Sequence, residues 1–209
     1  MSNSVLELNE VSISLDGKQL LEIDCRVGPG EIVTIMGPSG SGKSSLLAYI
    51  AGFLPKVFSS SGVVLVDGND ISSLAAERRR IGLLFQDPLL FPHLSVAGNL
   101  RFALTGKNLN KDQAIQQGLE EIGLAGFKDR DPGTLSGGQA SRVALLRLLL
   151  SEPNAVLLDE PFSKLDTALR EEVREIVFGK LRAAGLPTLL VTHDQADADS
   201  AGGTVHSLS

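Results

Sequence analysis

The residues best suited to chemistry form a stretch rich in glycine and serine, GPSGSGKSS, between the apolar run Ile32–Met36 and the helix-compatible run Leu46–Ile50. Glycines let backbone N–H groups turn inward around phosphate oxygens, and a helix start adds unpaired amides. Lys43 supplies a mobile positive charge for the β and γ phosphates, and the Ser44 hydroxyl can bind Mg²⁺. A plain turn is the alternative, but the order strand, loop, helix favours a phosphate site made by Gly37, Pro38, Ser39, Gly40, Ser41, Gly42, Lys43, Ser44 and Ser45.

A second candidate is the acidic end of the run Ala155–Leu158, which continues into Asp159 and Glu160. Carboxylates at the C-terminal end of a buried strand lie where ligands of open α/β sheets collect. Asp159 is expected to hold a metal ion through water, and Glu160 to take a proton from an attacking water. Alone, this pattern also fits a strand that simply meets solvent.

A third candidate is LSGGQ, at Leu135, Ser136, Gly137, Gly138 and Gln139. It precedes a predicted helix and can accept an anion at the helix start, although it carries no lysine of its own. The alternative role for Ser136 is that of an ordinary helix N-cap.

The elements that must position these residues alternate between strand and helix. Short apolar runs predict strands at Glu31–Met36, Val63–Val66, Ile81–Phe85, Ala155–Leu158 and Thr188–Thr192. Helical patterns cover Ser44–Phe53, Ser141–Leu150, Leu165–Ala184 and a stretch from Gln195 onward. This order predicts an α/β fold with a mostly parallel sheet.

Two regions depart from that alternation. The first thirty residues alternate apolar and polar side chains around the turn signal Asp16-Gly17, which predicts an antiparallel β layer joined by a hairpin around Asp67-Gly68. From Pro88 to Leu150 strand signals vanish, which predicts an all-helical insert.

The composition of the chain limits the classes of partner that it is expected to bind. The chain has 209 residues, 43% of them apolar and 21% charged, with a net charge of −6, so binding to nucleic acid or anchoring to an anionic membrane is disfavoured. A lone Cys25, the absence of zinc-ligand spacing and the absence of a secretory signal favour the cytosol.

Together with GPSGSGKSS and LSGGQ, the segments LLDEP at 157–161 and SKLD at 163–166, Gln86 after IGLLF and His193 in VTHD resemble the ATPase subunit of the ATP-binding cassette (ABC) superfamily. The resemblance covers about residues 5–200 in the family's motif order. It implies a P-loop NTPase core, formed by 1–86 and 152–209 within one 209-residue ATPase domain, and a helical subdomain over 87–151 that carries the signature motif.

The resemblance also implies a head-to-tail dimer around two Mg-ATP. Each nucleotide would lie between the lysine loop of one subunit and LSGGQ of the other. Gln86 would meet Mg²⁺ and the attacking water, with Ser44 and Asp159 as the other metal contacts. Asp166 would communicate across the dimer. His193 would contact the γ-phosphate and stabilise either the transition state or the arrangement of Glu160 and the attacking water. Gln86, Asp166 and His193 each also fit an ordinary polar position.

The implied partners are integral membrane permease subunits and a solute-binding protein, at the cytoplasmic face of the inner or plasma membrane. The segment Phe85–Val96 resembles the importer branch for thiamine, ferric iron and polyamines, and the length resembles the short thiamine-type subunits. A non-transport ABC ATPase of a cell-division or assembly complex is the alternative. The family usually places an adenine-stacking aromatic where this chain has Leu15, and no aromatic precedes Tyr49, so weak adenine discrimination is expected.

Overall fold

The computed structural model describes residues 4–104 and 110–208, so residues 105–109 of the predicted helical insert lie outside it. The chain forms two compact units. One comprises Met1–Leu83, Pro153–Glu160 and Phe178–Ser209, and the other comprises Leu84–Glu152 and Pro161–Val177. Within the described ranges, no helix has both the length and the apolar character needed to cross a membrane.

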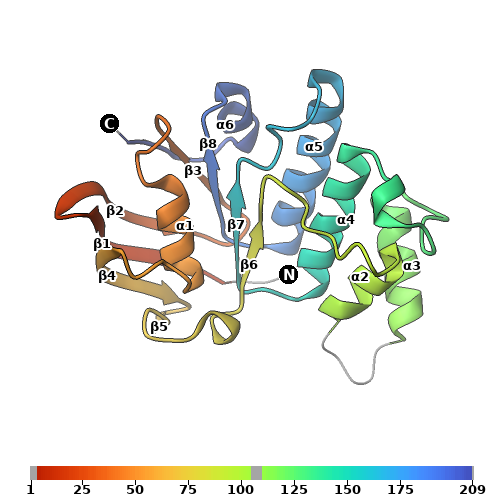
Figure 1. The fold of residues 1–209 in the computed structure, drawn as a ribbon, viewed down its shortest axis with the longest axis horizontal. Coiled ribbons are helices and arrows are strands. Elements are labelled where there is room, and N and C mark those ends of the chain that lie inside the picture. Colours follow the sequence, from red (N-terminus) through yellow and green to blue (C-terminus); the bar gives the residue numbers. More distant parts are fainter. Residues whose placement is uncertain (1–3, 105–109, 209) are drawn as a thin grey trace. The chain divides into compact units, whose positions relative to one another are not determined.

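The first unit contains a five-stranded sheet in the order β6-β7-β8-β3-β9 (Figure 1). Its strands are β6 (Ile81–Leu84), β7 (Ala155–Asp159), β8 (Thr188–Thr192), β3 (Ile32–Met36) and β9 (Val205–Ser207). The pairs β7–β8, β8–β3 and β3–β9 are parallel, which confirms the predicted α/β class. The strands β3, β7 and β8 are almost wholly buried, as their continuous apolar sequences require.

Parallel pairing brings the ends of three strands to one edge. Met36 of β3 lies opposite Thr192 of β8, and Asp159 of β7 lies opposite Val191. The residues that follow each strand therefore meet at this edge, although they come from distant parts of the sequence.

A second, antiparallel sheet in the same unit has the order β2-β1-β4-β5, from β1 (Leu6–Leu15), β2 (Lys18–Val27), β4 (Phe58–Val66) and β5 (Asn69–Asp70). Asp16-Gly17 and Asp67-Gly68 have positive φ at both residues, as the two-residue hairpin turns need. The predicted antiparallel layer is confirmed.

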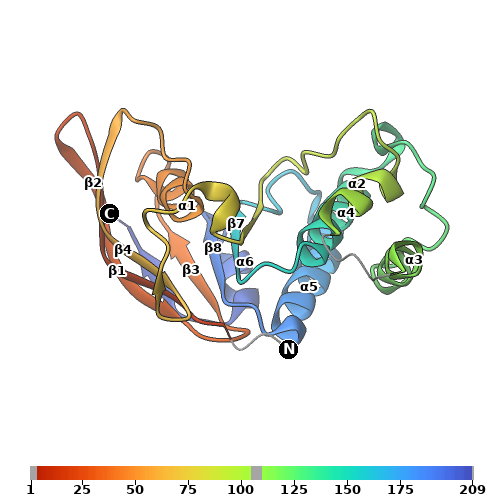
Figure 2. The same ribbon diagram turned by 90° about the horizontal axis from the view of Figure 1, so that it is seen from below.

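Helix α1 (Lys43–Ala51) lies between the two sheets of this unit (Figure 2). Its Leu46, Leu47 and Ile50 are at most 2% exposed and belong to one apolar core with strands of both sheets. Helix α6 (Gln195–Ala201) follows β8 in the same unit.

The second unit is helical, with α2 (Val96–Ala103), α3 (Lys111–Glu121), α4 (Gly137–Leu150) and most of α5 (Thr167–Ala184), whose last turns belong to the first unit. Its own core joins α2, α3 and α4 through buried residues such as Leu100, Ile115, Leu119 and Val143.

Candidate nucleotide site

The loop between β3 and α1 is shaped by its glycines. Gly40 and Gly42 have φ of 86° and 87°, a region that other residues rarely adopt. A Cβ on Gly42 would lie 2.8 Å from Cδ2 of Leu21, so this position also has too little room for a side chain. Gly42 caps α1 without a side-chain hydrogen bond, and the first amides of the helix therefore have no capping side chain.

Lys43 is held inside this loop. Its Nζ donates hydrogen bonds of 2.8 Å to the carbonyls of Gly37 and Pro38, and the residue is only 7% exposed. The ammonium group is thus anchored by neutral partners, with no described carboxylate in an ion pair with it. An ammonium group whose hydrogen-bond partners are neutral carbonyls suits a phosphate ligand.

The residues at the start of α1 and the end of β7 fit Mg²⁺. The Ser44 hydroxyl donates to Oδ1 of Asp159 at 3.5 Å, which pairs two of the hard oxygen donors that Mg²⁺ takes. Burial, followed by the charge of Glu160, raises the pKa of Asp159, while the Ser44 hydrogen bond and Lys43 oppose the rise. A nearby cation would relieve the cost of ionising this carboxyl.

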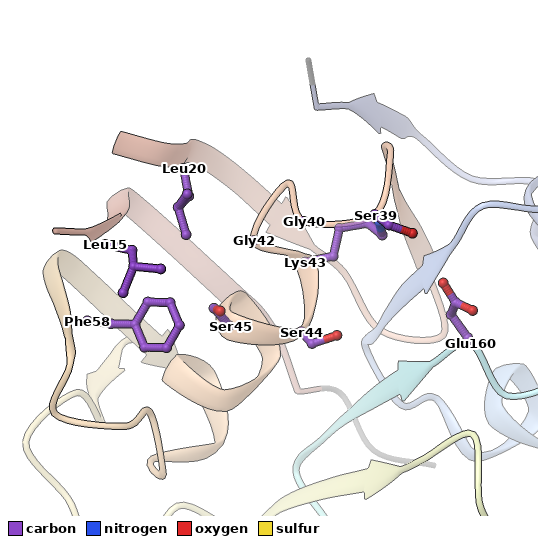
Figure 3. A pocket seen from close by; sticks show the side chains of 10 residues that line it. All are labelled: Leu15, Leu20, Ser39, Gly40, Gly42, Lys43, Ser44, Ser45, Phe58 and Glu160. Atoms are coloured by element: carbon purple, nitrogen blue, oxygen red, sulfur yellow. The ribbon is translucent and has the colours of Figure 1, made fainter. Parts of the chain in front are cut away.

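Glu160 and His193 form a pair at the same edge of the sheet. His193 Nδ1 lies 3.0 Å from Oε1 of Glu160, and the Glu160 amide donates to the carbonyl of Val191 at 2.9 Å. Glu160 has a φ of 44°, a strained value for a residue with a side chain. This strained turn directs the carboxylate toward the loop that holds Lys43 (Figure 3).

Of these groups, Lys43, Ser44 and Glu160 line a cavity of about 380 Å³, within the usual range of small-molecule sites. Figure 3 shows Ser39, Gly40, Gly42, Lys43, Ser44, Ser45 and Glu160 around it, together with Leu15, Leu20 and Phe58. Sequence reasoning did not anticipate Leu20 or Phe58, because their approach depends on strand pairing. The only sequence signal was an aromatic residue shortly before the strand expected at Val63–Val66.

The other predicted site residues belong to the second unit. Ser136 caps α4 in a capping box: its Oγ accepts from the Gln139 amide at 3.3 Å, while its amide donates to Oε1 of Gln139 at 3.0 Å. Asp166 accepts from the Leu169 amide at 3.0 Å at the start of α5, and Gln86 is exposed beyond β6. Ser136 and Asp166 thus each cap the start of a helix. Contact of Ser136, Asp166 or Gln86 with a nucleotide stays a prediction.

Comparison with known proteins adds independent findings. A family model described as ABC transporter matches residues 20–163. The chain is 47% identical to an uncharacterized ABC transporter ATP-binding protein, YnjD, of Escherichia coli, over 94% of this chain and 93% of the relative. It is 40% identical to the spermidine/putrescine import ATP-binding protein PotA of Mesoplasma florum, over 95% of this chain. It is 46% identical to the Fe(3+) ions import ATP-binding protein FbpC of Pseudomonas fluorescens, over 93% of this chain. The chain spans only 57% and 56% of the lengths of these last two relatives.

Proposed function

The chain belongs to the ABC transporter family as an ATP-binding ATPase subunit, and from this premise we propose that it drives an importer by hydrolysing Mg-ATP in the cavity beside Lys43. The observation that carries the proposed chemistry is that the Lys43 loop and Glu160 line one cavity, with His193 Nδ1 lying 3.0 Å from the Glu160 carboxylate. Each group matches a need of phosphoryl transfer, because Lys43 supplies a positive charge to the phosphates and Glu160 supplies a base that can take a proton from water.

The proposed step begins with ATP phosphates cradled by backbone N–H groups of residues 39–45 and by Lys43. Ser44 would hold Mg²⁺ directly and Asp159 would hold it through water, and the bound ion would neutralise phosphate charge. Glu160 takes a proton from water as the water oxygen bonds to the γ-phosphorus and the bond to ADP breaks. His193 positions the Glu160 carboxylate through the 3.0 Å contact.

Dimerisation completes the proposed site. Two copies would pack head to tail, so that Ser136, Gly137 and Gly138 of one copy meet the phosphates bound by the other. This arrangement gives the lysine-free helix start of α4 an anion to bind. Gln86 would report the state of the site to the helical unit, and Asp166 would link the two copies.

The importer assignment is supported by relatives whose names describe import of polyamines and of ferric ions. Permease subunits are the proposed partners at the cytoplasmic face of the membrane, with a solute-binding protein in the complete system. Copurification with a multispanning membrane protein is the expected result. Recovery in a division or assembly complex without a permease would instead favour the non-transport alternative.

The test of the proposed chemistry is Glu160→Gln, which keeps the shape of the side chain but removes the base. This variant should bind ATP, lose turnover and accumulate as a dimer in sizing experiments with saturating Mg-ATP. Glu77→Gln, an equal change of charge at an exposed residue that does not line the cavity, is the matched control. A Glu160→Gln protein that hydrolyses ATP at the control rate contradicts the assigned base, and one that stays monomeric contradicts the ATP-bound dimer.

A further inference from the structure

The cavity beside Lys43 has two chemically different ends. Lys43, Ser44 and Glu160 make one end polar, whereas Leu15, Leu20 and Phe58 gather at the other (Figure 3). None of these three side chains carries a hydrogen-bonding atom. A ligand that fills both ends therefore needs a charged part and a flat or apolar part, as a nucleoside triphosphate has.

Strand pairing brings the apolar side chains together. Leu15, the last residue of β1, lies directly opposite Phe58, the first residue of β4, so the two side chains share one face of the antiparallel sheet. Leu20 lies at a shift of register between β1 and β2, where an extra residue redirects a side chain. These features turn Leu20 toward the same space.

Phe58 alone among the described residues brings an aromatic ring to this cavity. Tyr49 packs against the core of the first unit, and its hydroxyl donates to the carbonyl of Gly62 at 2.8 Å. Phe53 is 48% exposed and does not line the cavity. Phe58 is half-buried against the same core, which holds its ring in place while one part of it faces the cavity.

We propose that Phe58 binds the base of the nucleotide by stacking, with Leu15 and Leu20 closing the apolar end around it. The inference rests on the proposed ATP site and names the residue that holds the base there. Every base offers a π-face, so stacking on a ring holds it without reading its hydrogen-bonding edge. The expected weak discrimination of adenine then follows from the apolar lining, and not from a missing ring.

The chain contains no tryptophan, so Phe58→Trp introduces a single tryptophan at the proposed contact, whose emission can be excited selectively at wavelengths where Tyr49 does not absorb. ATP should quench its emission, and inorganic tripolyphosphate, which has no base, should not. Phe53→Trp is the matched control, and its emission should not respond to ATP. Emission of the Phe58→Trp protein that responds equally to ATP and tripolyphosphate would overturn the proposal.

Affinity provides the second measurement. Phe58→Leu keeps an apolar side chain but removes the ring, and it should weaken ATP binding by about 5- to 100-fold while leaving tripolyphosphate binding unchanged. Adding Leu15→Tyr on the facing strand should restore most of the loss. Unchanged ATP affinity in a folded Phe58→Leu protein contradicts the role of Phe58. If the unmodified chain binds neither ATP nor tripolyphosphate, the proposed site itself is wrong.

Discussion

Ser136→Ala separates the two roles of the α4 start, as a helix cap and as a nucleotide contact. The substitution removes the 3.3 Å bond from the Gln139 amide and leaves the reverse bond, from the Ser136 amide to the Gln139 side chain, in place. Loss of one N-cap bond costs about 1 kcal/mol, or about 2–4 °C in Tm for a chain of this size. A hydroxyl that also donates to a phosphate contributes about 1.5–3 kcal/mol more to the transition state, which predicts a roughly 10- to 100-fold fall in kcat/KM.

Ser95→Ala is the matched control, because Ser95 caps α2 of the same unit by accepting from the Gly98 amide at 3.1 Å. Thermal unfolding should show equal losses for Ser95→Ala and Ser136→Ala. Steady-state ATP turnover of the purified chain, with ATP varied at fixed Mg²⁺, should fall only in Ser136→Ala. Equal turnover in the two variants would refute the nucleotide contact and leave Ser136 as a helix cap alone.

Three further predictions concern the first unit. Because burial and Glu160 raise the pKa of Asp159, its ionised form destabilises the nucleotide-free protein at neutral pH. Asp159→Asn should therefore raise Tm at pH 7. In a series of Tm measurements against pH, this rise in Tm should vanish as the pH falls below the ordinary pKa of an aspartate side chain. Burial raises the pKa of the Cys25 thiol to about 12, so mass spectrometry should find it alkylated by iodoacetamide at pH 8 only after unfolding in urea. Gly62→Ala should lower the free energy of unfolding in urea by more than about 2 kcal/mol, because Gly62 has a φ of 90° and a Cβ would lie 2.4 Å from the Glu10 carbonyl oxygen. Gly68→Ala is the control: its φ is 73° but a Cβ would enter open space, so the loss should be about 1 kcal/mol.

Local patterns predicted most of the elements correctly. The apolar run before Gly37 forms β3, and Thr188–Thr192 forms β8 with the predicted bounds. The helix expected at Ser141–Leu150 begins earlier, at Gly137, because Ser136 and Gln139 form a capping box. The strand expected at Val63–Val66 begins at Phe58, since pairing with β1 extends it through serines whose sequence gives no apolar alternation.

That extension is where sequence reasoning missed a cavity residue. Phe58 precedes three serines and looks like part of a loop when the chain is considered alone. Its position opposite Leu15 depends on the register between β1 and β4, which pairs residues forty-three positions apart. Sequence periodicity reports only on neighbours within a few residues and contains no information on that pairing.

The sequence by itself determined the chemistry available to this protein, because a glycine-rich loop with Lys43 and a strand ending in Asp159 and Glu160 carry their function in residue type and local order. The tertiary structure decided which of these groups meet. Parallel pairing of β3, β8 and β7 brings the residues after Met36, Asp159 and Thr192 to one edge, and antiparallel pairing brings Phe58 to the cavity. Hydrogen bonding between distant strands fixes both arrangements, and the physical reason is that strand register is set by the packing of the whole unit.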